Sequence, residues 1–201
     1  MNQQIFPLWL DLASVGVGAF QGALFAIVKK RFDLIGVIAM AILTGLGGGI
    51  VRDLLLGVGR PSGMQDRYLL TALAAVIAAL IYGKYVRENT KVVTVLDSIA
   101  TALFAIAGTY KAILFGSSAL VAVMLGIITA VGGGVLRDVV SRNTPQIFSG
   151  GPLYATGTAI GSSLFVVLNE TAINSDTTVV ICVSAIVVIH MVSIQIGRAH
   201  V

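Results

Sequence analysis

Long apolar stretches, separated by short polar connections, run through almost the whole chain. A helix of about 20 apolar residues crosses a hydrocarbon layer ~30 Å thick, so each stretch predicts a membrane span. The predicted spans cover residues 8–28, 33–57, 67–86, 92–113, 118–141, 152–169 and 177–196. The connections carry turn-forming residues, and none is long enough for a soluble domain. We therefore expect an all-α polytopic membrane protein, a single membrane domain over residues 1–201 with seven transmembrane helices.

The composition agrees with this class of protein. Of the 201 residues, 57% are hydrophobic and 11% are charged, whereas roughly a quarter are charged in ordinary soluble domains. The net charge of +4 is therefore expected to lie at a membrane surface and does not indicate nucleic-acid binding. A lone cysteine forms no intramolecular disulfide, so Cys182 is expected to be a small buried hydrophobic residue.

Basic residues gather on one side of the predicted spans, and this bias predicts the orientation. The first, third and fifth connections carry Lys29, Lys30, Arg31, Lys84, Arg87, Lys91 and Arg142. The opposite side has Arg60 and Arg67, with Lys111 near the end of a span. We therefore expect the N-terminus outside and the C-terminus in the cytoplasm.

The two ends of the chain carry separate expectations. The first twelve residues, MNQQIFPLWLDL, lack the basic region of a cleaved signal peptide, so the first span is expected to be retained. Residues 196–201, IGRAHV, match a conceptual translation of a common sequencing-adapter sequence. No function is therefore assigned to Arg198 or His200.

The second half of the chain repeats the first. Glycine triplets at 47–49 and 132–134 are each followed by an Arg-Asp pair, at 52–53 and 137–138. The same offset of 85 or 86 residues relates Asp11 to Asp97, Gly22 to Gly108 and Tyr68 to Tyr154. Residues 8–86 are thus a first three-helix repeat and residues 92–169 a second, with residues 177–196 as a seventh helix. Because three crossings are an odd number, the two repeats are inverted, which indicates a transport site at the midplane.

The glycine triplets have two interpretations. Glycine weakens a helix, so we expect breaks in spans 33–57 and 118–141, with freed carbonyls facing a wet cavity where they bind a cation. The residues concerned are Gly47, Gly48, Gly49, Gly132, Gly133 and Gly134. Small residues also recur at every fourth position through both triplets, a spacing that favours close helix packing. Thr44 and Thr129, one turn before each triplet, either line a pore or bond back to their own helices.

Charged residues within spans are costly, at ~3 kcal/mol each on insertion scales, and usually face a partner or water. The residues concerned are Asp11, Arg52, Asp53, Asp97, Arg137 and Asp138. Depth in the membrane predicts two cross-helix pairs, Asp11 with Arg52 and Asp97 with Arg137. Such pairs are either charged pore groups or locks between helices.

Lys111 breaks the repeat symmetry, because its counterpart is Phe25. This lysine either tunes ion access, holds a lipid phosphate or snorkels to the interface. Tyr110 beside it is expected to be interfacial. His190 is interpreted as a packed histidine, since span 177–196 has no acidic neighbour for it.

Enzyme chemistry is not expected. The sequence has no His/Cys/Glu cluster with metal-ligand spacing, and FSGGP (148–152) has no base nearby in sequence. GLGGGIVRD lacks the Lys-Ser/Thr of a phosphate-binding loop. No metal or other cofactor is therefore predicted.

The duplicated GGGxxRD pattern resembles the prokaryotic branch of the TRIC (trimeric intracellular cation) channel family, also described as a glycine-transporter-like family. The resemblance covers residues 8–196 and rests on three stretches. They are FDLIGVIAMAILTGLGGGIVRDLLLG (32–57), LDSIATALFAIAGTYKAI (96–113) and LGIITAVGGGVLRDVVS (125–141).

This resemblance implies a homotrimer with an hourglass pore in each protomer, constricted at the two glycine triplets. It implies conduction of monovalent cations, mainly K⁺ with Na⁺ permitted. Expected partners are membrane lipids and these cations, without nucleic acid; a bound lipid is compatible with this reading. The lysine motif through which animal members bind an inositol lipid is replaced here by the triplet, so lipid regulation is not carried over to Lys111. The expected location is the plasma (inner) membrane of a prokaryote.

Two other functions fit parts of the pattern. One is a secondary transporter of a small zwitterion such as glycine, whose carboxylate and amine would be held by helix ends and an Arg-Asp pair. The other is a scaffold without transport. Gly48→Leu and Gly133→Leu are expected to separate these classes, because a pore would be blocked while folding survives, and a scaffold would lose assembly.

Overall fold

The computed structural model describes residues 7–30, 32–87, 90–148, 154–171 and 174–198. Within these ranges the chain forms seven α-helices and no strand. Their bounds are α1 Leu8–Phe25, α2 Leu34–Leu55, α3 Asp66–Arg87, α4 Thr90–Leu114, α5 Ala119–Val140, α6 Tyr154–Asn169 and α7 Ser175–Arg198. A π-helical turn at Ala26–Lys30 follows α1, and short 3-10 turns at Ser62–Met64 and Gln146–Phe148 precede α3 and α6.

Six of these helices are long and apolar enough to cross a membrane, and α6 is a shorter apolar helix of 16 residues. Large apolar side chains cover much of the outer surface, including Ile35 at 76% exposure and Leu120 at 72%. This surface suits a hydrocarbon solvent, because apolar side chains lose nothing by facing lipid tails. The predicted all-α fold of seven transmembrane helices is confirmed.

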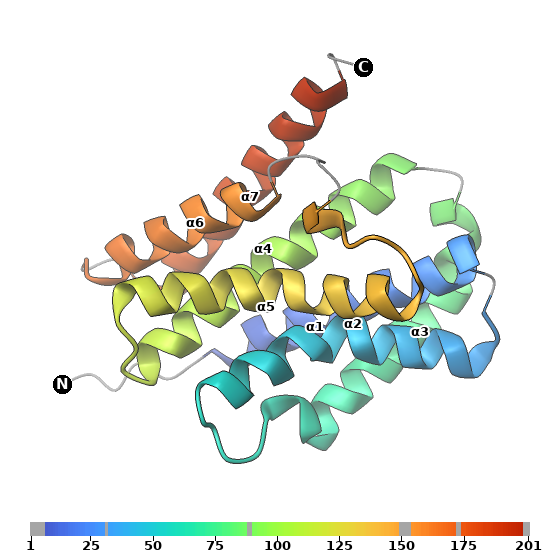
Figure 1. Ribbon diagram of the computed structural model, residues 1–201, viewed down its shortest axis with the longest axis horizontal. Helices are drawn as coiled ribbons and strands as arrows, with labels where there is room; N and C mark the ends of the chain where they lie inside the picture. Colours follow the sequence, from blue (N-terminus) through green and yellow to red (C-terminus); the bar gives the residue numbers. More distant parts are fainter. Residues whose placement is uncertain (1–6, 31, 88–89, 149–153, 172–173, 199–201) are drawn as a thin grey trace.

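The helices are arranged as two equivalent sets of three, α1–α3 and α4–α6. In the first set α1 packs against α2 and α3, and in the second α4 packs in the same way against α5 and α6. The sets meet where α2 crosses α5 and α1 contacts α4. Figure 1 shows α5 running through the middle of the molecule, with α6 and α7 on one side and α2 and α3 on the other. The seventh helix packs on α4 and α6.

Matching end structures fix the length of the two crossing helices. Asp33 caps α2 by accepting the N–H of Gly36 at 2.8 Å, and Ser118, 85 residues later, faces the Val121 N–H at 3.5 Å. A side-chain oxygen at this position satisfies a backbone donor that the first turn leaves free. At the other end Gly57 adopts a positive φ of 67°, and Arg142 takes the equivalent conformation at 57°. The repeat therefore extends to both ends of α2 and α5.

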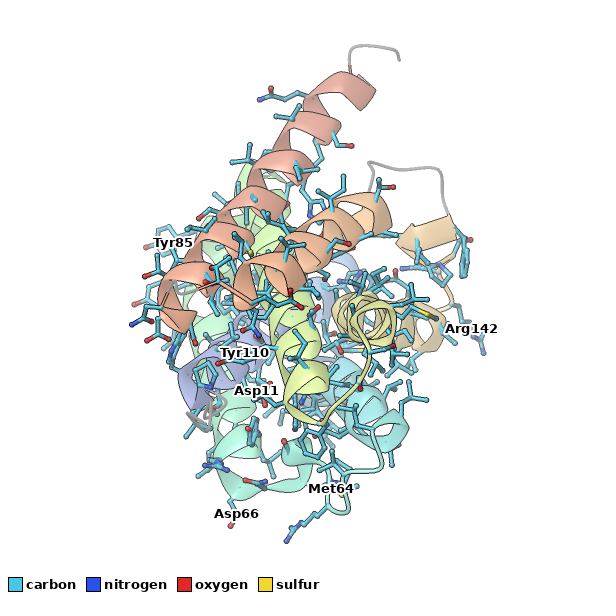
Figure 2. All side chains as sticks on the ribbon, turned by 90° about the vertical axis from the view of Figure 1, so that its left-hand side faces the viewer. Asp11, Met64, Asp66, Tyr85, Tyr110 and Arg142 are labelled. Atoms are coloured by element: carbon cyan, nitrogen blue, oxygen red, sulfur yellow. The ribbon has the colours of Figure 1, made fainter. Side chains whose placement is uncertain are left out.

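Small residues dominate the contacts between helices. Many of the alanines in these contacts are fully buried, at positions 19, 23, 41, 72, 79, 102, 105, 107, 112 and 122. Helix association in lipid depends on close packing, because the hydrophobic effect gives little net drive there. Polar side chains also lie deep in this bundle; Figure 2 shows Asp11 and Tyr110 inside it and Tyr85 and Arg142 at its surface. The buried polar groups define the candidate site.

Candidate functional site

The two glycine triplets lie in direct contact where α2 crosses α5. A β-carbon added to Gly48 would overlap the carbonyl oxygen of Thr129, and one added to Gly133 would overlap the carbonyl oxygen of Thr44. A β-carbon on Gly132 would come within 3.1 Å of the Gly48 Cα. The backbones of the two helices therefore touch, in a reciprocal contact that only glycine permits.

The predicted breaks at the triplets are wrong. Both α2 and α5 continue as α-helices through their glycines. The carbonyls that were expected to be freed therefore belong to regular helix. Tertiary packing compensates the low helix propensity of glycine, because each missing side chain allows a close backbone contact.

The third glycine of each triplet has different surroundings. A β-carbon at Gly49 would meet only Arg52 Nη2, at 3.8 Å, and one at Gly134 would meet only Arg137 Nη2, at 4.0 Å. These are ordinary contact distances. The close packing thus depends on two glycines of each triplet, and Gly49 and Gly134 lie beside the arginines.

Thr44 and Thr129 are buried next to the crossing. Each hydroxyl donates to the carbonyl four residues earlier, Thr44 to Met40 at 2.7 Å and Thr129 to Leu125 at 2.6 Å. The reading in which these hydroxyls bond to their own helices is therefore the observed one. The two threonine side chains also fill the space beside two repeat-related glycines. A β-carbon added to Gly22 would lie 2.5 Å from the Thr44 hydroxyl oxygen, and one added to Gly108 would lie 2.5 Å from the Thr129 hydroxyl oxygen.

On one side of the crossing lies a buried network, here called the Asp53 cluster: Asp11, Arg52, Asp53, Ser62, Tyr68 and Lys111. Arg52 binds Asp53 through Nε at 2.8 Å and Asp11 through Nη1 at 3.3 Å. The Tyr68 hydroxyl donates to the other oxygen of Asp11 at 3.0 Å. The predicted pair between Asp11 and Arg52 is confirmed.

Lys111 completes the cluster from α4. Its Nζ lies 2.9 Å from the carboxylate of Asp53 and donates to the Ser62 hydroxyl at 2.6 Å. The Ser62 backbone N–H donates to Asp53 as well, at 2.8 Å. Lys111 is 6% exposed, so the snorkelling interpretation is wrong: a buried carboxylate provides a better partner than the interface. Two carboxylates and two cations make the cluster formally neutral.

On the opposite side of the crossing a cleft of about 30 Å³ opens between α1, α4 and α5, with room for about two water molecules. We call it the Asp97 cleft. Its polar lining residues are Gln21, Thr44, Asp97, Thr101, Arg137, Asp138 and Gln146. With two carboxylates and one guanidinium, the lining has a formal charge of −1, in contrast to the neutral Asp53 cluster.

The second predicted pair is not formed. Asp97 accepts a hydrogen bond from the Gln21 side-chain amide, and the ion pair found for Arg137 joins its Nε to Asp138 at 2.9 Å. The Arg137 guanidinium lies over the ring of Phe25, 4.8 Å from its centroid. Since Gln21 has Ala107 as its repeat counterpart and Phe25 has Lys111, these two substitutions make the two sides of the crossing different.

Sequence reasoning missed Gln21, Ser62 and Phe25. Gln21 gave a usable signal, because it is a polar residue in an apolar span and has no polar counterpart in the repeat. Ser62 gave none, since a serine in a connecting loop is ordinary. Phe25 gave none either, because its ring matters only through its contact with the Arg137 guanidinium, and that contact is visible only in the structure.

The remaining residues lie away from the crossing. Cys182 is fully buried, as predicted, and His190 is 1% exposed and packs beside Gly157. Tyr110 is also 1% exposed, with its ring 5.2 Å from that of Phe165, so the expectation that it is interfacial is wrong. Among the described residues no three His, Cys, Asp or Glu side chains gather as metal ligands. The side chains of Lys29, Lys30, Arg31, Lys84, Arg87, Lys91, Tyr154 and Arg198, and residues 199–201, lie outside what is described.

A family model described as "Glycine transporter" matches this chain twice, over residues 8–84 and 94–170. A protein named "UPF0126 membrane protein" from Deinococcus radiodurans is 38% identical over 156 residues, covering 77% of this chain and 72% of the relative. The "UPF0126 inner membrane protein YadS" of Escherichia coli K12 is 36% identical over 155 residues, covering 76% and 74%. The chain belongs to this family of multi-pass bacterial membrane proteins, and it is not an enzyme.

A solved structure has the same fold. It is described as the TRIC trimeric intracellular cation channel orthologue from Rhodobacter sphaeroides, and it matches with a TM-score of 0.87 and 26% identity. The match covers 94% of this chain and 97% of that one. The predicted resemblance to the TRIC family is confirmed.

Proposed function

We propose that this protein is a passive channel for monovalent cations, K⁺ with Na⁺ permitted, acting as a homotrimer with one pathway in each protomer. The similar solved structure belongs to a trimeric cation channel, which supports both the ion class and the assembly. The observation that carries the proposal is a line of buried polar groups on both sides of the α2–α5 crossing. In a bundle that faces lipid, such groups are expected to mark an ion path.

The pathway has three parts in this proposal. A cation first meets the Asp97 cleft, whose negative lining attracts it and repels anions. It then reaches the crossing of the glycine triplets, which is the constriction of an hourglass. The Asp53 cluster forms the far mouth, near the ends of α2 and α4. By the distribution of basic residues, the Asp97 cleft faces the cytoplasm and the Asp53 cluster faces outward.

The described conformation is a closed one. Gly48 and Gly133 are in contact with opposing carbonyls, so no ion passes between α2 and α5 without separation of the two helices. Separation would expose the carbonyl oxygens of Thr44 and Thr129, which lie against these glycines. Backbone oxygens and threonine hydroxyls then replace part of the hydration shell of the ion. Selectivity between K⁺ and Na⁺ is expected to be modest, because the crossing offers few oxygens.

The Asp53 cluster keeps the far mouth shut in this proposal. Lys111 and Arg52 both hold Asp53, and the tethered ammonium of Lys111 takes the place that a passing cation would need. Reconstituted protein should therefore conduct K⁺, and Lys111→Met should raise K⁺ flux by about an order of magnitude, equivalent to roughly 1.4 kcal/mol of closed-state stabilisation. The measurement is single-channel recording in bilayers, with K⁺ flux into liposomes in parallel.

Phe25→Met is the matched control, since Phe25 is the repeat counterpart of Lys111 and holds no carboxylate. Because it removes no partner of a carboxylate, this variant should change K⁺ flux much less than Lys111→Met does. A complete lack of K⁺ current in folded, trimeric protein, for the Lys111→Met variant as well, would refute the channel proposal.

A second candidate function is transport of a small zwitterion such as glycine. The observation in its favour is that Arg137 and Asp97 line the same cleft without pairing with each other. Such a cleft offers a guanidinium to a carboxylate and a carboxylate to an amine. If the protein is this transporter, liposomes should take up labelled glycine with saturable kinetics, and Asp97→Asn should abolish uptake while Asp11→Asn reduces it less. Uptake without single-channel currents would favour this second function over the channel.

A further inference from the structure

Repeat symmetry assigns a closed form to the Asp97 cleft that the described conformation does not show. Asp97 and Arg137 are the counterparts of Asp11 and Arg52, which form a buried ion pair at 3.3 Å. Both members of the second pair line the cleft. Inverted repeats can exchange conformations, since each has the sequence features of the other. A state in which Asp97 binds Arg137 would therefore match, on the cleft side, the Asp11–Arg52 pair of the Asp53 cluster.

In the described conformation the partner of Asp97 is Gln21. The Gln21 side-chain amide donates to Asp97, and Gln21 is only 8% exposed, so packing fixes this contact. No such amide competes for Asp11, because the residue equivalent to Gln21 is Ala107. Of the two repeat differences at these sites, Gln21 for Ala107 is therefore the one that acts directly on the aspartate of the predicted pair, whereas Lys111 for Phe25 acts on Asp53.

Arg137 has the donors needed for the missing pair. Within the described part of the chain, the guanidinium of Arg137 donates a side-chain hydrogen bond through Nε, to Asp138. Its Nη2 lies 4.0 Å from the position of a β-carbon on Gly134, a residue that also lines the cleft. Arg52 uses Nε for Asp53 and Nη1 for Asp11 in the first repeat, so Arg137 has the same second donor available for Asp97.

We propose that Gln21 is the positioning residue that keeps the cleft open, by holding Asp97 away from Arg137, and that loss of this hold closes the cleft through an Asp97–Arg137 ion pair. This inference rests on the proposed function, because closing the cleft affects conduction only if cations pass through it. The opening of the cleft itself is measurable whether or not the protein conducts.

The test measures access to the cleft with a thiol. Val131 is half-buried and lines the cleft on α5, and Cys182 is removed as Cys182→Ser so that the Val131→Cys thiol is the one that reacts. Ag⁺ is the probe, since it is a small monovalent cation that binds thiolates. Its reaction is read as protection of that thiol from a fluorescent maleimide added after denaturation.

In this background Gln21→Ala should slow the reaction with Ag⁺ by about tenfold, because the closed form becomes the main population. Adding Asp97→Asn to Gln21→Ala should restore the rate to that of Asp97→Asn alone, since asparagine forms no ion pair with Arg137. A merely structural contribution of Gln21 would not be rescued by a second substitution at position 97. An unchanged rate in Gln21→Ala, or no rescue by Asp97→Asn, would overturn the proposal.

If wild-type protein conducts nothing yet the Ag⁺ rates follow the expected pattern, the proposed channel function fails and the closing of the cleft stands. If Gln21→Ala prevents folding, Gln21→Leu fills the same volume without the amide and should give the same slow reaction.

Discussion

Gly48→Ala should destabilise the folded protein by about 3 kcal/mol, at the upper end of what overpacking costs. The added β-carbon overlaps the carbonyl oxygen of Thr129, and a backbone atom in a regular helix cannot move aside as a side chain can. Gly133→Ala should behave in the same way, because its β-carbon overlaps the carbonyl of Thr44. Thermal unfolding of the purified protein in detergent measures the loss.

Gly49→Ala and Gly134→Ala are the matched controls, with the same substitution in the same triplets. An added β-carbon there meets only an arginine Nη2, at 3.8 or 4.0 Å. Alanine also favours helix by up to ~1 kcal/mol over glycine, so these variants should be as stable as the unmodified protein or slightly more so. A loss at Gly49 equal to that at Gly48 would contradict the assignment of the close contact to particular glycines of the triplet, and a gain in stability at both positions would show that helix propensity outweighs the crossing.

The same geometry changes what substitution by leucine can show. Gly48→Leu and Gly133→Leu were expected to block a pore while folding survived, but a leucine at either position starts with the same backbone overlap. Loss of assembly in these variants would therefore not indicate a scaffold. Conduction by the Lys111→Met protein is the sharper test between a channel and a scaffold.

Asp53→Asn should cost about 3–5 kcal/mol, the usual effect of removing one partner from a buried ion pair. Asp53 is fully buried and holds Arg52, Lys111 and the Ser62 N–H. Asparagine keeps the shape but removes the charge, so the neutral cluster becomes a buried site with a net charge of +1. The loss is measured by thermal unfolding, together with the elution volume of the protein on size exclusion.

Asp138→Asn is the control from the second repeat. Asp138 has one cationic partner, Arg137, at the edge of a cleft with a formal charge of −1. The substitution makes that lining neutral and leaves Arg137 beside space for water, so the expected loss is about 1.5–3 kcal/mol, smaller than that at Asp53. A loss at Asp138 as large as that at Asp53 would contradict the different electrostatics assigned to the two mouths.

The sequence located the charged pair at Asp11 and Arg52 because depth in the membrane can be counted along a helix. The same count failed for Asp97 and Arg137. Their depths match, but Gln21 reaches Asp97 from α1, and the choice between an amide and a guanidinium depends on distances across three helices. Lys111 was open to several interpretations for the same reason, since its carboxylate partner is 58 residues away.

The sequence by itself determined the membrane class, the seven helices and the duplication, because these follow from the length of apolar runs and from a repeat offset that needs no coordinates. It also singled out the glycine triplets and the charged positions beside them. Only the tertiary structure decided that the triplets are unbroken helix in contact, that the charged groups on one side of the crossing form a buried cluster and that those on the other side line a cleft. Whether a glycine bends a helix or brings two helices together depends on the neighbour it faces, and that neighbour is fixed by packing across the two repeats.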